Sequence, residues 1–328
     1  MAGPRTLGSM PLSSHAAAPG PAACSTASAR LGEPLAGTAP HAPRWLAIEQ
    51  PGPWGPRALT ESHLPRELGR ALGAKAEAAG VRIALIRRPG RHAERTPDAP
   101  RRVLLADTRP GRTTLWSWQT TDAASLLDLD FDAPGKPLHE GPPPLLICTN
   151  ARRDECCALT GRALASWLAQ DAETDTAAVW ESDHLGGHRF APTAVLLPTG
   201  YLYGRLDGPA AREILRETSA GRVSLAGCRG RSTWSRAGQA AELALRGQLQ
   251  EFAPDAVRVL GERSLDPLPG AAGPSPDTHR YEVRLAAGEA VFRAEVAETA
   301  AAHPRPESCG KAPGNPLELC VLRLEKEG

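Results

Sequence analysis

Cysteines and histidines gather in one stretch of the chain, residues 145–206. It reads LLICTNARRDECCALTG and, after a short interval, VWESDHLGGHRFAPTAVLLPTGYLYGRL. Three of the seven cysteines, Cys148, Cys156 and Cys157, lie in this stretch. Two of the nine histidines, His184 and His188, lie there as well. Thiolates and imidazoles bind transition metals directly, so these side chains are first of all candidate metal ligands.

The cysteines follow a pattern that places side chains at the end of a strand. Residues 145–147 form a buried apolar run that leads into Cys148, and α/β folds place reactive groups at the carboxyl edge of such strands. A polar loop then leads to Cys156 and Cys157. The spacing of apolar residues after them predicts a helix over 158–169. Its expected apolar face consists of Leu159, Ala163 and Trp167.

The histidines follow another predicted strand, at residues 177–180. Residues four apart would share one face of a helix, but Gly186 and Gly187 lie between them. Each glycine costs a helix about 1 kcal/mol, so a tight loop is favoured. Glycine would also let backbone N–H groups come close to an anion or a cluster sulfide. Beyond the loop, a turn at residues 198–200 predicts a hairpin.

Composition sets the class of protein. The 328 residues carry a formal net charge of +1, which predicts neither a nucleic-acid partner nor an anionic membrane surface. No apolar run approaches the roughly 20 residues of a membrane span, and none at the N-terminus is typical of a signal peptide. An odd number of cysteines with one adjacent pair indicates a reducing compartment, so we expect a cytoplasmic protein.

The order of patterns predicts four segments. Residues 1–43 are rich in Ala, Pro, Ser and Gly and predict a disordered arm, in which Cys24 would be an exposed, unpaired thiol. Residues 44–140 show a β-α-β-β-β pattern, which predicts a smaller N-terminal α/β domain. Residues 141–252 form the domain with the cysteines and histidines. Residues 253–328 predict a small β-rich appendage with strands at 281–285, 290–296 and 317–324.

The quoted motifs resemble those of the sucrase/ferredoxin-like family. The resemblance rests on CTNxRRDxCC, WExxHLGGHRFAP and LPTGxLYGRL, with C-x8-C and H-x3-H spacing, and WLAIEQPGPWG extends it toward the N-terminus. It implies a thioredoxin-like ferredoxin in which two cysteines and two histidines hold a [2Fe-2S] cluster. The implied cluster ligands are Cys148, Cys157, His184 and His188. The expected fold class is therefore α/β, with a thioredoxin-like ferredoxin domain between the N-terminal domain and the β-rich segment.

The chemistry of the residues agrees with this implication. Two thiolates and two neutral imidazoles fill the four terminal positions of a two-iron cluster, as in a Rieske centre. The residues alone leave open whether Cys156 or Cys157 is the ligand, because successive side chains of an extended stretch point in opposite directions. The family spacing implies Cys157. For Cys228, Cys309 and Cys320 we favour a role as core or surface thiols.

Three other functions fit some of the same residues. A structural zinc site also uses two cysteines and two histidines, and the adjacent cysteines could serve a thiol-based redox protein. A glycosidase would need two carboxylates, and Glu181 with Asp183 is the only candidate pair. We interpret these two acids as partners of the histidines or turn caps instead. An electron carrier with protein redox partners is therefore favoured over a hydrolase.

Arginines lie in two places in the sequence where they could have a structural or functional role. Arg152, Arg153 and Asp154 lie between the cysteines, and Arg189 and Arg205 lie in the later motifs, as loop-holding ion pairs or as groups that tune the cluster. A basic group also precedes the central domain, and we interpret it as a solvated face rather than a docking surface for an acidic partner. It consists of Arg87, Arg88, Arg91, Arg101 and Arg102.

Overall fold

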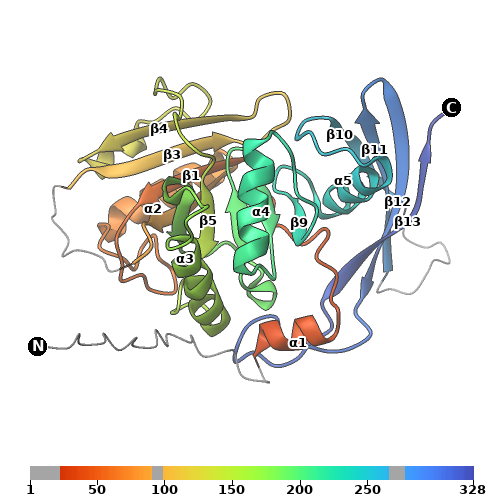
Figure 1. Cartoon of the computed structure of the whole chain (residues 1–328), viewed down its shortest axis with the longest axis horizontal. Helices are drawn as coiled ribbons and strands as arrows, with labels where there is room; N and C mark the ends of the chain where they lie inside the picture. Colours follow the sequence, from red (N-terminus) through yellow and green to blue (C-terminus); the bar gives the residue numbers. More distant parts are fainter. Residues whose placement is uncertain (1–22, 91–98, 266–277) are drawn as a thin grey trace, which may run out of the picture.

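The computed structural model describes residues 23–90, 99–265 and 278–328. Two sheets make up its framework (Figure 1). The strands of the larger sheet are β1 (Arg44–Glu49), β2 (Val81–Arg87), β3 (Arg101–Asp107), β4 (Thr114–Thr120), β5 (Leu145–Cys148), β6 (Val179–Ser182), β7 (Ala194–Leu196), β8 (Tyr201–Tyr203) and β9 (Cys228–Arg231). The smaller sheet consists of β10 (Val257–Ser264), β11 (Thr278–Ala287), β12 (Ala290–Ala300) and β13 (Leu317–Lys326).

Helices connect and cover these strands. The α-helices are α1 (Cys24–Arg30), α2 (Arg66–Ala78), α3 (Arg162–Leu168), α4 (Gly208–Ser219) and α5 (Arg236–Leu249). Short turns are the 3₁₀ segments η1 (Ala123–Leu127), η3 (Thr176–Ala178) and η4 (His188–Phe190) and the π-helical segment η2 (Cys157–Gly161). Local signals fix the helix starts. For example, Asp207 accepts the Ala210 N–H at 2.8 Å at the start of α4.

The larger sheet is built from two halves of the same topology. Its order is β4-β3-β1-β2-β6-β5-β7-β8-β9. In the first half β1 and β2 are parallel and joined by α2, while β3 and β4 are added antiparallel on the other side of β1. In the second half β5, β6, β7 and β8 repeat this arrangement with α3. The halves meet where β2 pairs antiparallel with β6. The segments 44–140 and 141–252 therefore contribute to one continuous sheet.

Alternation along the strands gives the larger sheet two apolar faces. On β5, Leu145 and Ile147 pack with α3 and α4, whereas Leu146 and Cys148 point to the opposite face. The helices α2, α3 and α4 lie on one side of this sheet (Figure 1). The other side is covered in part by residues from 23–43, including Cys24, and by Leu185. Cys148 thus points away from the helical layer.

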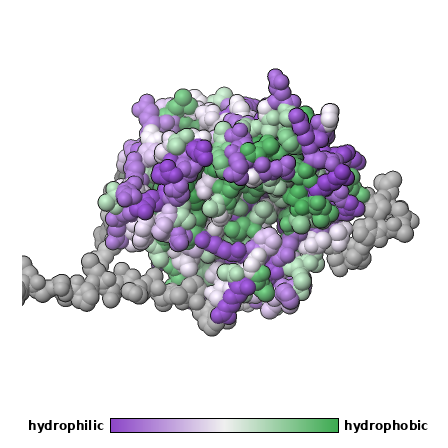
Figure 2. Space-filling view, turned by 45° about the vertical axis from the view of Figure 1, so that its right-hand side comes forward, coloured by the Kyte–Doolittle hydropathy of each residue, from purple (hydrophilic) through white to green (hydrophobic). Residues whose placement is uncertain are grey.

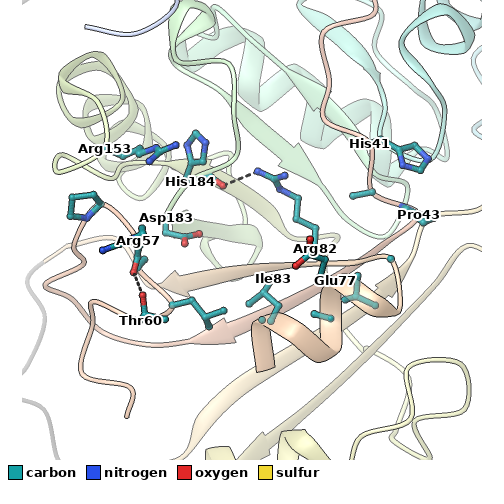
Figure 3. Close-up of a pocket in the computed structure, with 18 residues that line it drawn as sticks. His41, Pro43, Arg57, Thr60, Glu77, Arg82, Ile83, Arg153, Asp183 and His184 are labelled. Carbon is teal, nitrogen blue, oxygen red and sulfur yellow. Dashed lines mark hydrogen bonds between the residues drawn. The ribbon is translucent and has the colours of Figure 1, made fainter. Parts of the chain in front are cut away.

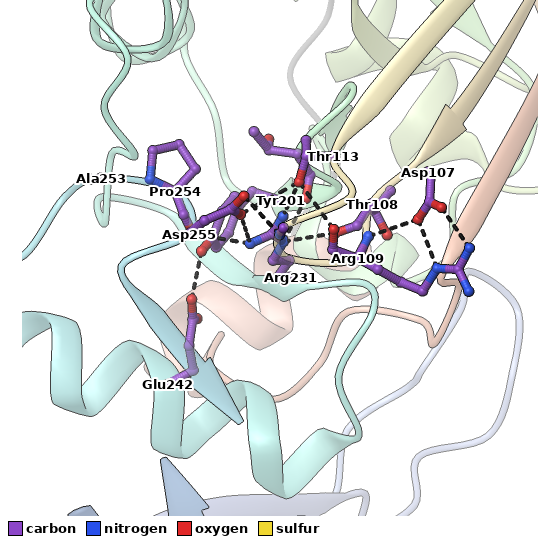
Figure 4. Close-up of polar contacts among 12 residues, drawn as sticks. Asp107, Thr108, Arg109, Thr113, Tyr201, Arg231, Glu242, Ala253, Pro254 and Asp255 are labelled. Atoms are coloured by element: carbon purple, nitrogen blue, oxygen red, sulfur yellow. Dashed lines mark hydrogen bonds and ion pairs between the residues drawn. The ribbon is translucent and has the colours of Figure 1, made fainter. Parts of the chain in front are cut away.

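The smaller sheet is antiparallel and packs on α5. Buried Arg231 of β9 ties it to the larger sheet (Figure 4). Its guanidinium donates to the carbonyls of Thr108 and Thr199 at 3.0 and 2.9 Å and to the Asp255 carboxylate at 2.8 Å. One face of the molecule, turned toward the smaller sheet, mixes hydrophobic residues with hydrophilic ones (Figure 2). Within the described ranges, no helix is long and apolar enough to cross a membrane.

The α/β class with a β-rich C-terminal segment is confirmed. The first half shows the predicted β-α-β-β-β order, and the predicted hairpin at 195–206 and the three C-terminal strands are present. The strand β10 was not predicted, because its sequence VRVLGERS lacks an apolar alternation beyond its first residues. The larger sheet continues across the boundary expected at residue 140, so that domain division stays a prediction.

Two local predictions are wrong. The disordered arm was expected to reach residue 43, but α1 forms at Cys24–Arg30 and Cys24 is 0% exposed. Residues 1–22 lie outside the described residues. The expected face of the helix after Cys157 is also wrong: α3 buries Leu164, Ala165 and Leu168 and leaves Trp167 exposed. The π-helical turn η2 contains one residue more than a turn of α-helix. The residues of α3 are therefore rotated, and a different set of side chains faces the core.

Candidate metal centre

Cys148 is the last residue of β5 and is almost fully buried. The strand position is fixed by the hydrogen bond of its N–H to the Thr193 carbonyl, at 2.9 Å. Its Sγ lies 2.8 Å from the Asp183 carbonyl, to which the thiol donates. Backbone N–H groups of Leu185 and Asn150 also point to this sulfur and stabilise its thiolate form. The sulfur at the end of the strand is therefore surrounded by one carbonyl acceptor and two backbone donors.

Cys157 brings a second sulfur to the same place. It opens the π-helical turn η2, and its Sγ lies 3.4 Å from Nδ1 of His188. The hydrogen bond between Cys157 and Cys148 holds the pKa of Cys148 below its usual range. The same contact, together with burial, raises the pKa of Cys157. The two thiols share one hydrogen bond, so the pair as a whole gives up its first proton more readily than its second.

The histidines lie in a tight loop after β6, as predicted from the two glycines between them. Gly186 and Gly187 have φ of +88° and +78°, values that L side chains rarely adopt. A Cβ on Gly187 would collide with Nη2 of Arg229, a buried side chain of β9 that packs against the loop. Arg229 donates to the Gly186 carbonyl at 2.9 Å and to the Thr38 carbonyl. The loop therefore needs glycine at both positions.

Both imidazoles are held in their neutral form. Their rings stack with centroids 4.5 Å apart and an interplanar angle of 25°. Burial lowers the pKa of His184 to about 3 and lowers that of His188 as well. Nδ1 of His184 is buried and has no hydrogen-bond partner among the described residues. An unpaired, neutral imidazole nitrogen in a buried position is suited to binding a metal.

Two clefts are lined by His184, and one of them also by His188, but neither is lined by Cys148 or Cys157. One, of about 630 Å³, is lined by Asp183, His184 and Arg153 together with residues of the first half (Figure 3). In it, Arg82 donates to the His184 carbonyl at 3.3 Å. The other, of about 560 Å³, is lined by both histidines and by four basic residues. These are Arg152, Arg153, Arg189 and Lys311.

The family model described as sucrase/ferredoxin-like matches residues 35–230, more than half of the chain. The chain belongs to the sucrase/ferredoxin-like family. The match covers both halves of the larger sheet and all four predicted ligand residues, Cys148, Cys157, His184 and His188. Comparisons with curated proteins and with solved structures found no match.

The donor set fits an iron-sulfur cluster in its chemistry. Two cysteines and two neutral histidines supply the four terminal ligands that a two-iron cluster needs. Asp154, Cys157 and His188 also have donor atoms within 4.8 Å of one another, a grouping that could hold a metal ion. The 3.4 Å between Cys157 Sγ and His188 Nδ1 is close to the edge of a tetrahedron around one zinc ion, about 3.6 Å for ordinary bond lengths.

The carboxylates near the histidines have other partners than predicted. Glu181 forms a buried ion pair with Arg87 at 2.6 Å, and it accepts a hydrogen bond from Thr149. Asp183 accepts the Leu85 N–H at 3.1 Å, and burial raises its pKa to about 6. Neither carboxylate contacts an imidazole in the described residues, so the prediction that they orient the histidine rings is wrong. The alternative, a turn cap, fits Asp183, whose carboxylate also accepts the backbone N–H of His184.

The predicted solvated face is wrong for Arg87 and Arg101 and is confirmed for Arg88, which is exposed. Arg87 and Arg101 are buried, and Arg88 lies over the Trp180 ring at 3.6 Å. Arg91 lies outside the described residues. Arg189 pairs with Glu33 of the N-terminal segment at 2.7 Å. Arg152 and Arg153 remain exposed beside the histidine cleft.

Sequence reasoning missed a second group of donors. Cys24, Asp154, Cys156 and Cys309 have donor atoms within 4.8 Å of one another. Cys156 points into this group and not toward Cys148, and the hydrogen bond from the Cys24 thiol lowers its pKa to about 6. Cys228 is buried in the core and Cys320 is exposed, as expected of core and surface thiols. No spacing motif links Cys24 and Cys309 to Cys156, because 132 and 153 positions separate them from it.

Proposed function

We propose that this protein is an electron carrier that binds one [2Fe-2S] cluster through Cys148, Cys157, His184 and His188. The observation that supports the proposal is a chain of buried contacts: Cys148 bonds to Cys157, Cys157 lies 3.4 Å from His188, and His188 stacks on His184, whose Nδ1 is unpaired among the described residues. When bound, the cluster would accept and donate single electrons. Imidazole ligands lower its negative charge, so its potential should lie above the roughly −400 mV of plant-type ferredoxins.

The chain's own residues would then do three things. Backbone N–H groups of Leu185 and Asn150 would stabilise charge on the Cys148 sulfur. Arg229 would fix the histidine loop by its hydrogen bond to Gly186. The first half of the sheet would exclude water from the cysteine side, because β2 covers the edge of β6.

The topology supports a thioredoxin-like ferredoxin domain as part of this proposal. The order β8-β7-β5-β6, with β7 antiparallel to its neighbours and a helix between β5 and β6, is the arrangement that such a domain would have. The cluster ligands would follow the carboxyl ends of β5 and β6. Reactive groups of α/β folds are found at such edges.

The electron would enter and leave at the surface where the two clefts reach His184, called the histidine side below. His184 lines both clefts, whereas Cys148 and Cys157 are 1% exposed. Exposed Arg152, Arg153 and Lys311 surround that side. A positive rim favours the docking of an acidic protein partner, chiefly through a faster association rate. We place the protein in the cytoplasm, where thiol ligands stay reduced.

The test is a spectrum of anaerobically purified protein before and after reduction with dithionite, with iron and sulfide assayed on the same sample. We expect visible absorption that bleaches, with about two irons and two sulfides per chain. Cys148→Ser should lose the absorption and the iron. Cys228→Ser is the matched control, because Cys228 is also buried in the larger sheet but lies in a different apolar cluster. Colourless wild type that stays colourless after reconstitution would refute the proposal.

A structural zinc site is the second candidate. The 3.4 Å separation of Cys157 Sγ and His188 Nδ1 favours it, because this distance fits donors on one metal ion. It predicts a colourless protein whose zinc disappears in Cys148→Ser. Iron analysis of the same samples separates the two candidates.

A further inference from the structure

Three cysteines outside the proposed cluster site meet around one point. Sγ of Cys156 lies 3.5 Å from Sγ of Cys24 and 3.2 Å from Sγ of Cys309. The remaining pair, Cys309 and Cys24, is 3.6 Å apart. Each thiol therefore touches the other two.

The three sulfurs come from segments that are far apart in the sequence. Cys24 opens α1, Cys156 directly precedes η2, and Cys309 lies in the connection between β12 and β13. Cys24 and Cys156 are at most 1% exposed. Cys309 is partly exposed and lines the cleft of about 560 Å³ that is also lined by both histidines. The group is thus buried on two sides and open on the third, which gives an ion a path of entry.

Asp154 adds an oxygen donor to the three sulfurs. Its two carboxylate oxygens lie 3.9 and 3.8 Å from Sγ of Cys24. They accept hydrogen bonds from the N–H groups of Cys156 and Cys309 and from the Ser308 hydroxyl, each at 2.9 Å. These bonds hold the carboxylate in place and leave it lone pairs for a metal.

We propose that Cys24, Cys156, Cys309 and Asp154 bind one zinc-like ion. A tetrahedral zinc–thiolate site with bonds of about 2.3 Å places its sulfurs about 3.8 Å apart. The observed separations of 3.2, 3.5 and 3.6 Å lie within about 0.6 Å of that value. Three thiols in mutual contact suit a single ion, since the ligands of a four-iron cluster each bind a different iron and lie farther apart.

The ion would be distinct from the proposed cluster. Cys156 and Cys157 are neighbours in a helical turn, where successive side chains point about 100° apart. Cys157 faces His188 and Cys148, whereas Cys156 faces Cys24 and Cys309. The adjacent cysteines thereby serve two different sites.

Such an ion would fasten both ends of the described chain over the histidine loop. The helix α1 packs against η4, which contains His188. A buried ion-pair group lies along the same junction, where Glu33 pairs with Arg189 and with Arg305 at 2.7 Å each. Zinc would therefore add a covalent-strength link to a junction that now rests on ion pairs and small apolar contacts.

The experiment counts zinc, iron and sulfide in the same anaerobic preparations of the full chain. Each preparation is equilibrated with equimolar zinc sulfate and then passed over a chelating resin. We expect about one zinc per wild-type chain and at least a fivefold loss in Cys24→Ser and Cys309→Ser. Cys320→Ser, which changes an exposed cysteine of β13, should keep the zinc. Iron and sulfide should stay unchanged in Cys309→Ser.

Two further measurements protect the result from a folding artefact. Cys309→His restores a zinc ligand in the same loop and should regain most of the zinc. X-ray absorption at the zinc edge should show three sulfurs at about 2.3 Å and one oxygen at about 2.0 Å.

Three outcomes would overturn the inference. One is wild type with less than about a tenth of a zinc per chain after equilibration. Another is a disulfide between Cys156 and Cys309 found by mass spectrometry of the anaerobic protein. The third is zinc that persists in Cys309→Ser but disappears in Cys148→Ser, which would assign the metal to the four-residue site and support the zinc alternative there. Wild type that holds zinc but no iron would refute the proposed cluster only. The zinc counts of Cys24→Ser and Cys309→Ser would still decide the zinc site.

Discussion

The two halves of the larger sheet share one topology, but in the described residues only the second has cysteine and histidine side chains at or just after the ends of its parallel strands. In the first half β1 ends at Glu49, and in the second β5 ends at Cys148. The segment after β2 begins with Arg88, whereas the segment after β6 contains His184 and His188. The same backbone arrangement thus carries different chemistry. Fold alone does not specify a site, because a site depends on the few residues placed at the strand ends.

The first half stabilises the second half and supplies none of the four proposed ligands. The contacts of β2 with β6 and with Asp183 are called the brace below. Arg87 of β2 and Glu181 of β6 form a buried ion pair at the edge where the halves meet. Leu85 exchanges two hydrogen bonds with Asp183, which directly precedes His184. Trp54 stacks under the Arg87 guanidinium at 4.2 Å. The histidine loop is therefore held by a strand of the half that contributes no ligand.

The comparison predicts that breaking this brace will have the largest effect on stability. Arg87→Met should lower the free energy of unfolding by about 3–5 kcal/mol, because it leaves Glu181 buried without its cation. Arg216→Met, which removes exposed pairs with Glu213 and Glu217, should change the stability far less, because solvent screens exposed ion pairs. Denaturant unfolding followed by circular dichroism measures both.

A double variant sharpens this prediction. Arg87→Met combined with Glu181→Leu should recover most of the loss, since apolar side chains of similar size replace a buried ion pair at little cost. A double variant as unstable as Arg87→Met alone would show that packing, and not the unpaired charge, is what the brace supplies.

The second prediction concerns the histidine loop. Gly187→Ala should destabilise the protein and reduce its metal content several-fold, because the new Cβ would meet Arg229 in a backbone conformation with φ of +78°. Gly288→Ala is the matched control: it also has a positive φ, of +59°, but nothing lies within 4 Å of its Cβ. Equal metal content in the two variants would contradict a role of Arg229 in supporting the loop.

The third and smallest effect concerns charge at the histidine side. Arg153→Glu should slow reoxidation of the reduced protein by ferricyanide several-fold and speed reoxidation by hexaammineruthenium(III), because the local potential becomes less positive. Arg70→Glu, on α2 of the first half, should change neither rate by as much. Stopped-flow traces at low and high salt measure the effect, which should fade as the Debye length shortens. Equal changes for both oxidants would place electron exit elsewhere.

Much of the fold could be predicted from local patterns. The apolar run at 45–48, the leucines of α2 and the hairpin around residues 198–200 each lie within a few residues of the chain, and each formed as expected. Gly186 and Gly187 indicated a tight loop because no helix tolerates both cheaply. The π-helical turn η2 was not predictable in this way, and it moved the apolar face of α3 away from Trp167.

The arginines show where local reasoning fails. Arg87 and Arg101 were interpreted as part of a solvated face because charged residues are rarely buried. Both are buried, and Arg87 is paired with Glu181, a residue 94 positions away. Nothing within a short window of sequence reveals such a partner. Burial of a charge is decided by which segments the chain packs together.

The sequence by itself determined the β-α-β-β-β order of the first half, the hairpin of the second, the family and the four candidate ligands, because these depend on motifs and on short-range periodicity. Only the tertiary structure decided that the two halves form one sheet and that Cys24 and Cys309 meet Cys156. Their separations of 132 and 153 positions leave no spacing signal. Contacts over such distances form only when packing of the larger sheet, α1 and the β-rich segment has already brought the backbones together, and no local pattern encodes that convergence.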